Sequence, residues 1–139
     1  TLPTFRSWVQ FPSPAPKNLK WKIIYFMNDL SKKKCVPCSG DIPAFTEDQI
    51  QNFKSKIDKW DVKKNEKGYF YLSKDYKFEN FEKSLNFVNK VSQIAEYENH
   101  HPDLKFGWGY ANIIIFTHAI NGLAESDFVL AAKIDEISV

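Results

Sequence analysis

The stretch that decides the fold runs from Asn80 to His118 and reads NFEKSLNFVNKVSQIAEYENHHPDLKFGWGYANIIIFTH. In its first half, apolar residues recur with a 3.6-residue period over four turns, which predicts an amphipathic helix: Phe81, Leu85, Val88, Val91, Ala95. Pro102 has no amide hydrogen and disfavours helical geometry in the residue before it, so the helix is expected to end within YENHHP. His100 and His101 are therefore predicted to lie at the carboxyl end of a helix.

The second half of this stretch is rich in residues that favour β-strands. Isoleucines and aromatic residues dominate it, and alternate positions would share one face of a strand: Phe106, Trp108, Tyr110, Asn112, Ile114, Phe116. Ile113 and Ile115 on the opposite face are apolar too, so the end of this strand is expected to be covered on both faces. We predict one strand over residues 106–116, followed by His118.

Three further patterns place the other elements. The sequence TEDQ at residues 46–49 has the form of a capping box and predicts a helix over 46–59. Strands are predicted at 60–64 and 69–73 around a turn containing Gly68. A last helix is expected to open at Asp127, with an apolar stripe of Leu130, Ile134 and Ile137. The order α-β-β-α-β-α predicts the α+β class, an antiparallel sheet with helices packed on one face.

Residues 1–45 differ in composition from the rest of the chain. Most of the seven prolines lie there, which predicts an irregular N-terminal arm with one short strand at Trp21–Phe26, followed by a single domain over residues 46–139. The arm contains both cysteines, Cys35 and Cys38, in the sequence CVPC. A loop turn whose thiols pair under oxidation, half of a metal site and a redox motif all stay open, with the loop turn favoured.

Overall composition excludes several classes of protein. The 139 residues suit one domain, and 43% hydrophobic with 16% aromatic content is too apolar for a disordered chain. A net charge of +2 indicates no particular polyanion, so no nucleic-acid partner is expected, and the lysine run 32–34 is read as a solvated loop rather than a phosphate contact. No apolar stretch approaches the ~20 residues that a membrane span needs, which predicts a protein of the cytoplasm.

The only three histidines of the chain lie between residues 100 and 118, at predicted ends of elements. Histidine both gives and takes protons near neutral pH, so His100, His101 and His118 favour a proton-transfer site. A zinc site that adds Glu96 or Asp127 is the competing interpretation, although adjacent histidines seldom point the same way. No serine lies in a GxSxG motif and the cysteines are distant in sequence, which argues against covalent catalysis.

These residues resemble the pterin-4a-carbinolamine dehydratase family. The resemblance rests on EYENHHP, followed at fixed spacing by Trp108, His118 and Asp127, and on the end segment FTHAINGLAESDFVLAAKI. It extends over residues 46–137. One departure is Ala124, where many members have Ser or Thr as a helix cap, and this change is expected to cost about 1 kcal/mol of helix stability.

The resemblance implies a hydro-lyase that converts 4a-hydroxytetrahydropterin to quinonoid dihydropterin, in the recycling of tetrahydrobiopterin, with no metal and no bound cofactor. It implies that His100 and His118 form the acid/base pair and that His101 anchors the pterin. Asp127 is expected to orient and charge-stabilise a histidine, with His118 as the expected partner. Glu96 is expected to bond His100 or the amino edge of the pterin, and Trp108 to line the pocket.

An alternative comes from a different class of protein. Members of this family in animals also serve as dimerisation cofactors of a homeodomain transcription factor, so an oligomeric binding module without catalysis stays open. The resemblance further implies a homo-oligomer, a dimer or a tetramer, and a possible protein partner.

Overall fold

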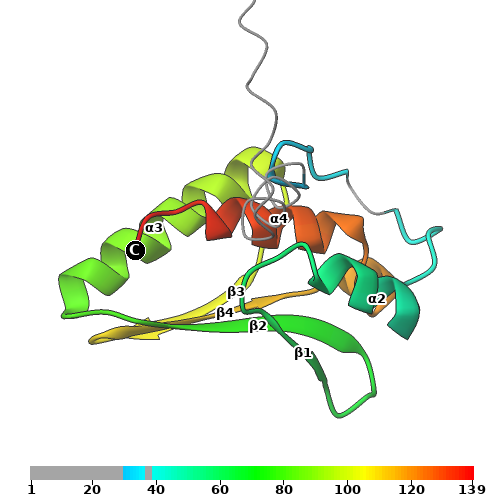
Figure 1. Ribbon diagram of the computed structural model, residues 1–139, viewed down its shortest axis with the longest axis horizontal. Helices are drawn as coiled ribbons and strands as arrows, with labels where there is room; N and C mark the ends of the chain where they lie inside the picture. The colour runs from blue at the N-terminus through cyan, green and yellow to red at the C-terminus, as the bar shows by residue number, and fades with distance from the viewer. Residues whose placement is uncertain (1–29, 37–38) are drawn as a thin grey trace, which may run out of the picture.

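The computed structural model describes residues 30–36 and 39–139, and within them helices cover one face of a four-stranded antiparallel sheet (Figure 1). The elements in chain order are α2 Glu47–Lys54, β1 Asp61–Lys64, β2 Phe70–Lys77, α3 Phe81–Glu98, β3 Asp103–Gly107, β4 Tyr110–Ile115, the 3-10 helix η1 His118–Ile120 and α4 Glu125–Asp135. The strands are ordered β1-β2-β4-β3. The predicted α+β class, with an antiparallel sheet and helices on one face, is confirmed.

Helix α3 begins and ends where polar side chains replace missing helical hydrogen bonds. The Asn80 side chain accepts a hydrogen bond from the Lys83 amide at the start of the helix. At the end, Asn99 takes a left-handed conformation with φ 51°, which asparagine tolerates better than most residues. This reversal releases His100 and His101 from the helix axis, so both histidines follow a helix carboxyl end as predicted.

Helix α2 is shorter than the predicted 46–59. Its capping box is present: the Thr46 hydroxyl accepts from the Gln49 amide, and the Gln49 side chain accepts from the Thr46 amide. The helix stops at Lys54 because the chain beyond it is drawn toward α4, where the Asp58 amide donates to the Asp135 carboxylate at 2.9 Å.

The predicted single strand over 106–116 is wrong, because the chain folds there into a hairpin of β3 and β4. Gly109, with φ 75°, makes the tight turn after Trp108. The turn moves the following residues to a new strand, so Phe106 lies opposite Ala111 on the helix-covered face, while Tyr110 lies on the other face. The three aromatics of this stretch therefore do not share a face. The element order becomes α-β-β-α-β-β-α.

The sheet has one covered face and one open face. Leu72, Ile113 and Ile115 point toward the helices and are fully buried, as are Phe128 and Leu130 of α4. Asn112 and Ile114, on the opposite face, are only partly buried. The prediction that the end of this strand is covered on both faces is therefore wrong for a single chain.

Within the described residues, no helix is both long and apolar enough to cross a membrane. The predicted strand Trp21–Phe26 lies outside the described residues, and the division into an arm of 1–45 and a domain of 46–139 stays a prediction. Residues 30–36 and 39–45 nevertheless contact the domain; the Phe45 amide, for example, donates to the Leu123 carbonyl at 2.8 Å.

Candidate active site

The site is centred on a hydrogen bond between His100 and Asp127. The His100 Nε2 atom lies 2.8 Å from Asp127 Oδ1. The Asp127 side chain has no exposed surface, and 14% of the His100 side chain is exposed. A buried carboxylate needs donors around it, and a histidine that retains some exposure can still reach a ligand. The pair therefore combines a fixed, buried anchor with an accessible imidazole.

Asp127 is itself held in place by two further donors on its second oxygen. The Thr117 hydroxyl donates to Asp127 Oδ2 at 2.9 Å, and the Ala124 amide donates to the same atom at 2.8 Å. Helix α4 begins at Glu125, two residues before the predicted opening at Asp127, so Asp127 lies in its first turn and caps the helix from inside. Its carboxylate accepts from the Ala124 amide, as the N3 residue of a capping box does, while Ala124 has no polar side chain to accept a hydrogen bond from the first turn in return.

This arrangement corrects the predicted partner of Asp127. The carboxylate bonds His100, whereas His118 was the expected partner. With Asp127 as acceptor, the His100 Nε2 atom carries the ring hydrogen, and Nδ1 is the nitrogen that remains for proton exchange with a ligand. The sequence did not predict a role for Thr117; its position directly before His118 was the available signal.

His101 and Glu96 form a second pair on the surface. The His101 Nε2 atom lies 2.8 Å from Glu96 Oε1, and the two side chains are 57% and 78% exposed. The expected bond from Glu96 to His100 is therefore absent, and Glu96 orients the neighbouring imidazole instead. Because both groups are exposed, this pair holds His101 only weakly.

His118 reaches the same region from the segment that follows β4. In the β3–β4 hairpin Asp103 lies opposite Ile114, and this register brings the residues just before β3 alongside those just after β4. His118 is exposed at the start of η1, and its ring centroid lies 4.0 Å from that of Phe116. Thr117 bonds the buried Asp127, whereas its neighbour His118 is exposed to solvent. The short segment after β4 therefore supports the buried carboxylate and also presents an accessible imidazole.

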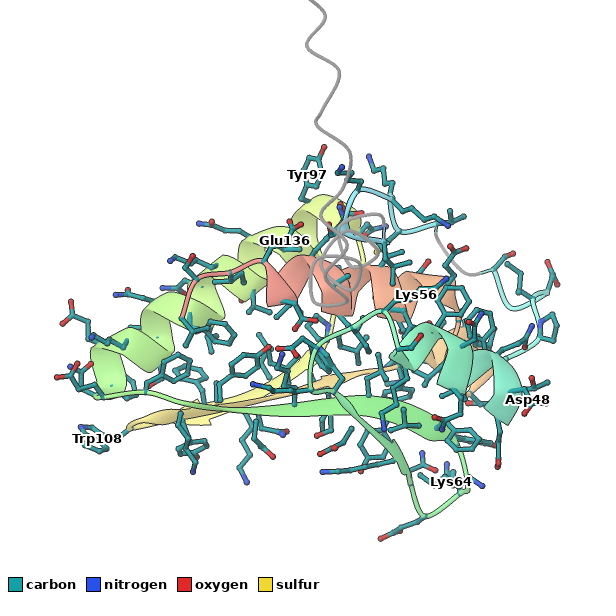
Figure 2. All side chains as sticks on the ribbon, viewed as in Figure 1. Asp48, Lys56, Lys64, Tyr97, Trp108 and Glu136 are labelled. Carbon is teal, nitrogen blue, oxygen red and sulfur yellow. The ribbon has the colours of Figure 1, made fainter. Side chains whose placement is uncertain are left out.

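Trp108 lies away from the histidines. It occupies the turn at the far end of β3, with 72% of its surface exposed, and Figure 2 shows it at the left end of the molecule, well apart from Tyr97 in the last turn of α3. Trp108 follows His101 by seven positions of mostly extended chain, which corresponds to roughly 20 Å. The structure therefore does not bring Trp108 to the three histidines within one chain.

Among the residues that the structure describes, no group of three or more His, Cys, Asp and Glu side chains is arranged to hold a metal ion. A pocket of about 530 Å³ lies beside the first turn of α4, and the described residues that line it include no histidine: Lys33, Lys34, Val36, Ile42, Phe45, Ala124, Glu125, Ser126, Val129. The proton-transfer interpretation rests on the histidines and not on this pocket.

Comparison with known proteins identifies the family. The family model for pterin 4 alpha carbinolamine dehydratase matches residues 43–137. The chain belongs to this family. A relative from Rickettsia canadensis that bears the family name is 49% identical over 110 residues, which cover 78% of this chain and 97% of the relative.

Plant and solved-structure relatives agree. Pterin-4-alpha-carbinolamine dehydratase 2, mitochondrial, from Arabidopsis thaliana is 47% identical over 113 residues, 80% of this chain and 60% of the plant protein. The crystal structure of a transcriptional coactivator/pterin dehydratase from Brucella melitensis superimposes with a TM-score of 0.58 at 25% identity, covering 66% of this chain and 94% of that chain. The family resemblance and the hydro-lyase class predicted from it are confirmed.

Proposed function

We propose that this protein dehydrates 4a-hydroxytetrahydropterin to quinonoid dihydropterin by histidine acid/base catalysis, in the recycling of tetrahydrobiopterin. The observation that carries the proposal is the His100–Asp127 hydrogen bond in a chain of the carbinolamine dehydratase family. The reaction expels the 4a-hydroxyl as water and removes the proton from N5, with no change of redox state. Two positioned proton carriers are sufficient for these two transfers.

The geometry suggests a role for each histidine. His100 takes the N5 proton at Nδ1, because Asp127 holds its Nε2–H and stabilises the imidazolium that forms. His118 protonates the departing 4a-hydroxyl as the C4a–O bond breaks. His101, held by Glu96, anchors the pterin and keeps it oriented between the other two. Trp108 can contact the same pterin only from a second copy of the chain.

The test is the decay of 4a-hydroxytetrahydropterin followed by ultraviolet absorbance, with the wild type, His100→Ala and His118→Ala, each with and without EDTA. Loss of a proton carrier should lower kcat by about 10² to 10⁴. Glu79→Gln, which removes an exposed ion pair with Lys83 at the start of α3, is the matched control and should retain full activity. Wild-type turnover in both histidine variants would refute the assignment.

The alternative is an oligomeric binding module that does not catalyse. The Brucella relative is described as both transcriptional coactivator and pterin dehydratase, and strands β1 and β3 form the two edges of the sheet, where a second copy can pair. We propose a homo-oligomer on this basis, to be measured by light scattering after size-exclusion chromatography. A wild-type protein that does not accelerate the decay of the pterin would favour the binding module.

A further inference from the structure

The His100–Asp127 hydrogen bond is one side of a closed ring of contacts between the end of α3 and the start of α4. On one side, His100 Nε2 bonds Asp127 Oδ1. On the other side, Cys35 bonds a residue close to each member of that pair. Its amide donates to Glu98 Oε2 at 2.8 Å, and its thiol donates to the Ser126 carbonyl at 3.4 Å. Glu98 precedes His100 by two residues and Ser126 precedes Asp127 by one. Cys35 therefore links the same two helix ends that the catalytic pair links.

Glu98 is the charged residue on the Cys35 side of this ring. It is the last residue of α3, its side chain is only 1% exposed, and Lys133 of α4 lies 3.1 Å from its Oε1 atom. Burial works to raise the pKa of Glu98, but the Cys35 amide and the Lys133 ammonium outweigh burial and lower that pKa below its ordinary value. Glu98 is therefore a charged acceptor that ties the end of α3 to α4 and to residue 35.

The contacts of Cys35 and its neighbour complete the connection to α4. Burial, with a contribution from Glu98, raises the pKa of the Cys35 thiol to about 12, so the thiol keeps its hydrogen and donates it. The Val36 amide donates to the Ser126 hydroxyl at 3.1 Å, and that hydroxyl donates to the Val36 carbonyl at 2.8 Å. In Figure 1 the segment that begins at residue 30 lies over the carboxyl end of α3, beside α4.

We propose that Glu98 and Cys35 are positioning residues for the dehydration, because they fix the distance between the end of α3 and the start of α4 that the His100–Asp127 bond requires. The inference rests on the catalytic role proposed for that pair. It extends the site beyond the family segment, since residues 30–42 precede the region of 43–137 that the family model matches. Displacing a reacting group by ~1 Å can cost about 10²-fold in rate.

The experiment compares Glu98→Ala, Glu98→Gln and Cys35→Ala in the full chain. Glu98→Ala should lower kcat by about 10- to 100-fold with KM changed less than about threefold, because it displaces a reacting group and leaves the pterin contacts of His101 in place. Glu98→Gln should recover part of kcat, since its amide oxygen still accepts from the Cys35 amide while the ion pair with Lys133 is lost. Cys35→Ala should lower kcat by roughly three- to tenfold, because it removes only the weak thiol bond.

A spectroscopic measurement separates this inference from the proposed function. The His100 Nε2–H proton, bonded to a buried carboxylate, should give a slowly exchanging NMR signal that broadens in Glu98→Ala, whether or not the protein has dehydratase activity. Asp135→Asn is the matched control: Asp135 is a buried carboxylate at the other end of α4, bonded to Trp60 and Lys74. It should lower stability and leave both kcat and the Nε2–H signal unchanged.

Three results would overturn the inference. The first is a Glu98→Ala protein with an unchanged Nε2–H signal. The second is an equal loss of kcat in Asp135→Asn, which would mean that any loosening of α4 has the same effect. The third, which applies if Glu98→Ala does not fold, is a Cys35→Ala protein with wild-type kcat and an unchanged Nε2–H signal.

Discussion

Replacing Asp127 with asparagine tests the centre of the site with the smallest change in shape. The carboxylate accepts two hydrogen bonds on Oδ2, from Thr117 and from the Ala124 amide, and one on Oδ1, from His100. The Ala124 amide is a donor only, so the oxygen of the new side chain must take the Oδ2 position. The new NH₂ group then faces His100.

The expected loss of rate follows from this orientation. Facing a donor, His100 has to accept at Nε2, and its ring hydrogen moves to Nδ1, the nitrogen proposed to take the N5 proton. The same substitution in serine protease triads lowers kcat about 10⁴-fold through the wrong tautomer. We expect a loss of about 10² to 10⁴ in kcat, or roughly 3 to 5 kcal/mol. Stability should fall by only about 1.5 to 3 kcal/mol, the contribution of one hydrogen bond to a charged group.

The assay is the decay of 4a-hydroxytetrahydropterin, with urea unfolding of the same samples to confirm that the variant is folded. Glu125→Gln serves as the control, because Glu125 is a half-exposed neighbour that pairs with Lys33 on the surface. It should retain kcat within about twofold, as surface ion pairs contribute ~0–1 kcal/mol. An Asp127→Asn protein that turns over like the wild type would refute the role given to the His100–Asp127 bond.

Three further predictions concern stability and reactivity. Ala124→Ser should raise the free energy of unfolding by about 0.5 to 1 kcal/mol in urea titrations, because Ala124 has extended backbone at the N-cap of α4 and makes no side-chain cap; no gain would show that the Asp127 amide is already satisfied by the Ala124 carbonyl, which accepts from it at 3.2 Å. The fold lowers the pKa of Glu98, so its carboxylate stabilises the protein at pH values above its ordinary pKa of 4.5, and this stabilisation is lost as the pH falls below 4.5. Glu98→Gln should flatten this loss of stability in unfolding curves measured from pH 7 to pH 3. An unchanged slope would contradict the assignment. In a Cys38→Ser variant, the Cys35 thiol should react with an aromatic disulfide reagent at pH 8 only after denaturation, and rapid reaction in the folded protein would show that it is not buried.

Local signals in the sequence predicted most of the elements correctly. The period of α3, the capping box at Thr46 and the turn at Gly68 depend on neighbours within a few residues, and each appears in the structure. The β3–β4 hairpin was missed because the alternation of apolar residues continues through Trp108 and Gly109, which hides the change of direction. A period of two residues indicates a strand and carries no information on where that strand reverses.

For the site too, the sequence indicated which residues take part but not how they are paired in space. The histidines and Asp127 were found from their chemistry and from the family resemblance, whereas their pairing depends on which helix ends meet. That Asp127 faces His100, and that Cys35 lies against Ser126, are consequences of the packing of α3 on α4, which no local pattern reports. The separation of Trp108 from the histidines within one chain follows from the same hairpin, and its contact with the pterin stays a prediction.

The contact between Cys35 and Ser126 spans 91 positions along the chain, and this separation matters while the protein is being made. A ribosome that adds ~5 to 20 residues per second leaves Cys35 without its partner for roughly 5 to 20 s after it is synthesised. Throughout that interval the thiol lacks the burial that raises its pKa, and it lies three positions from Cys38. A nascent chain is therefore more open to oxidation at this point than the finished protein, and a reducing environment during translation should increase the yield of active enzyme.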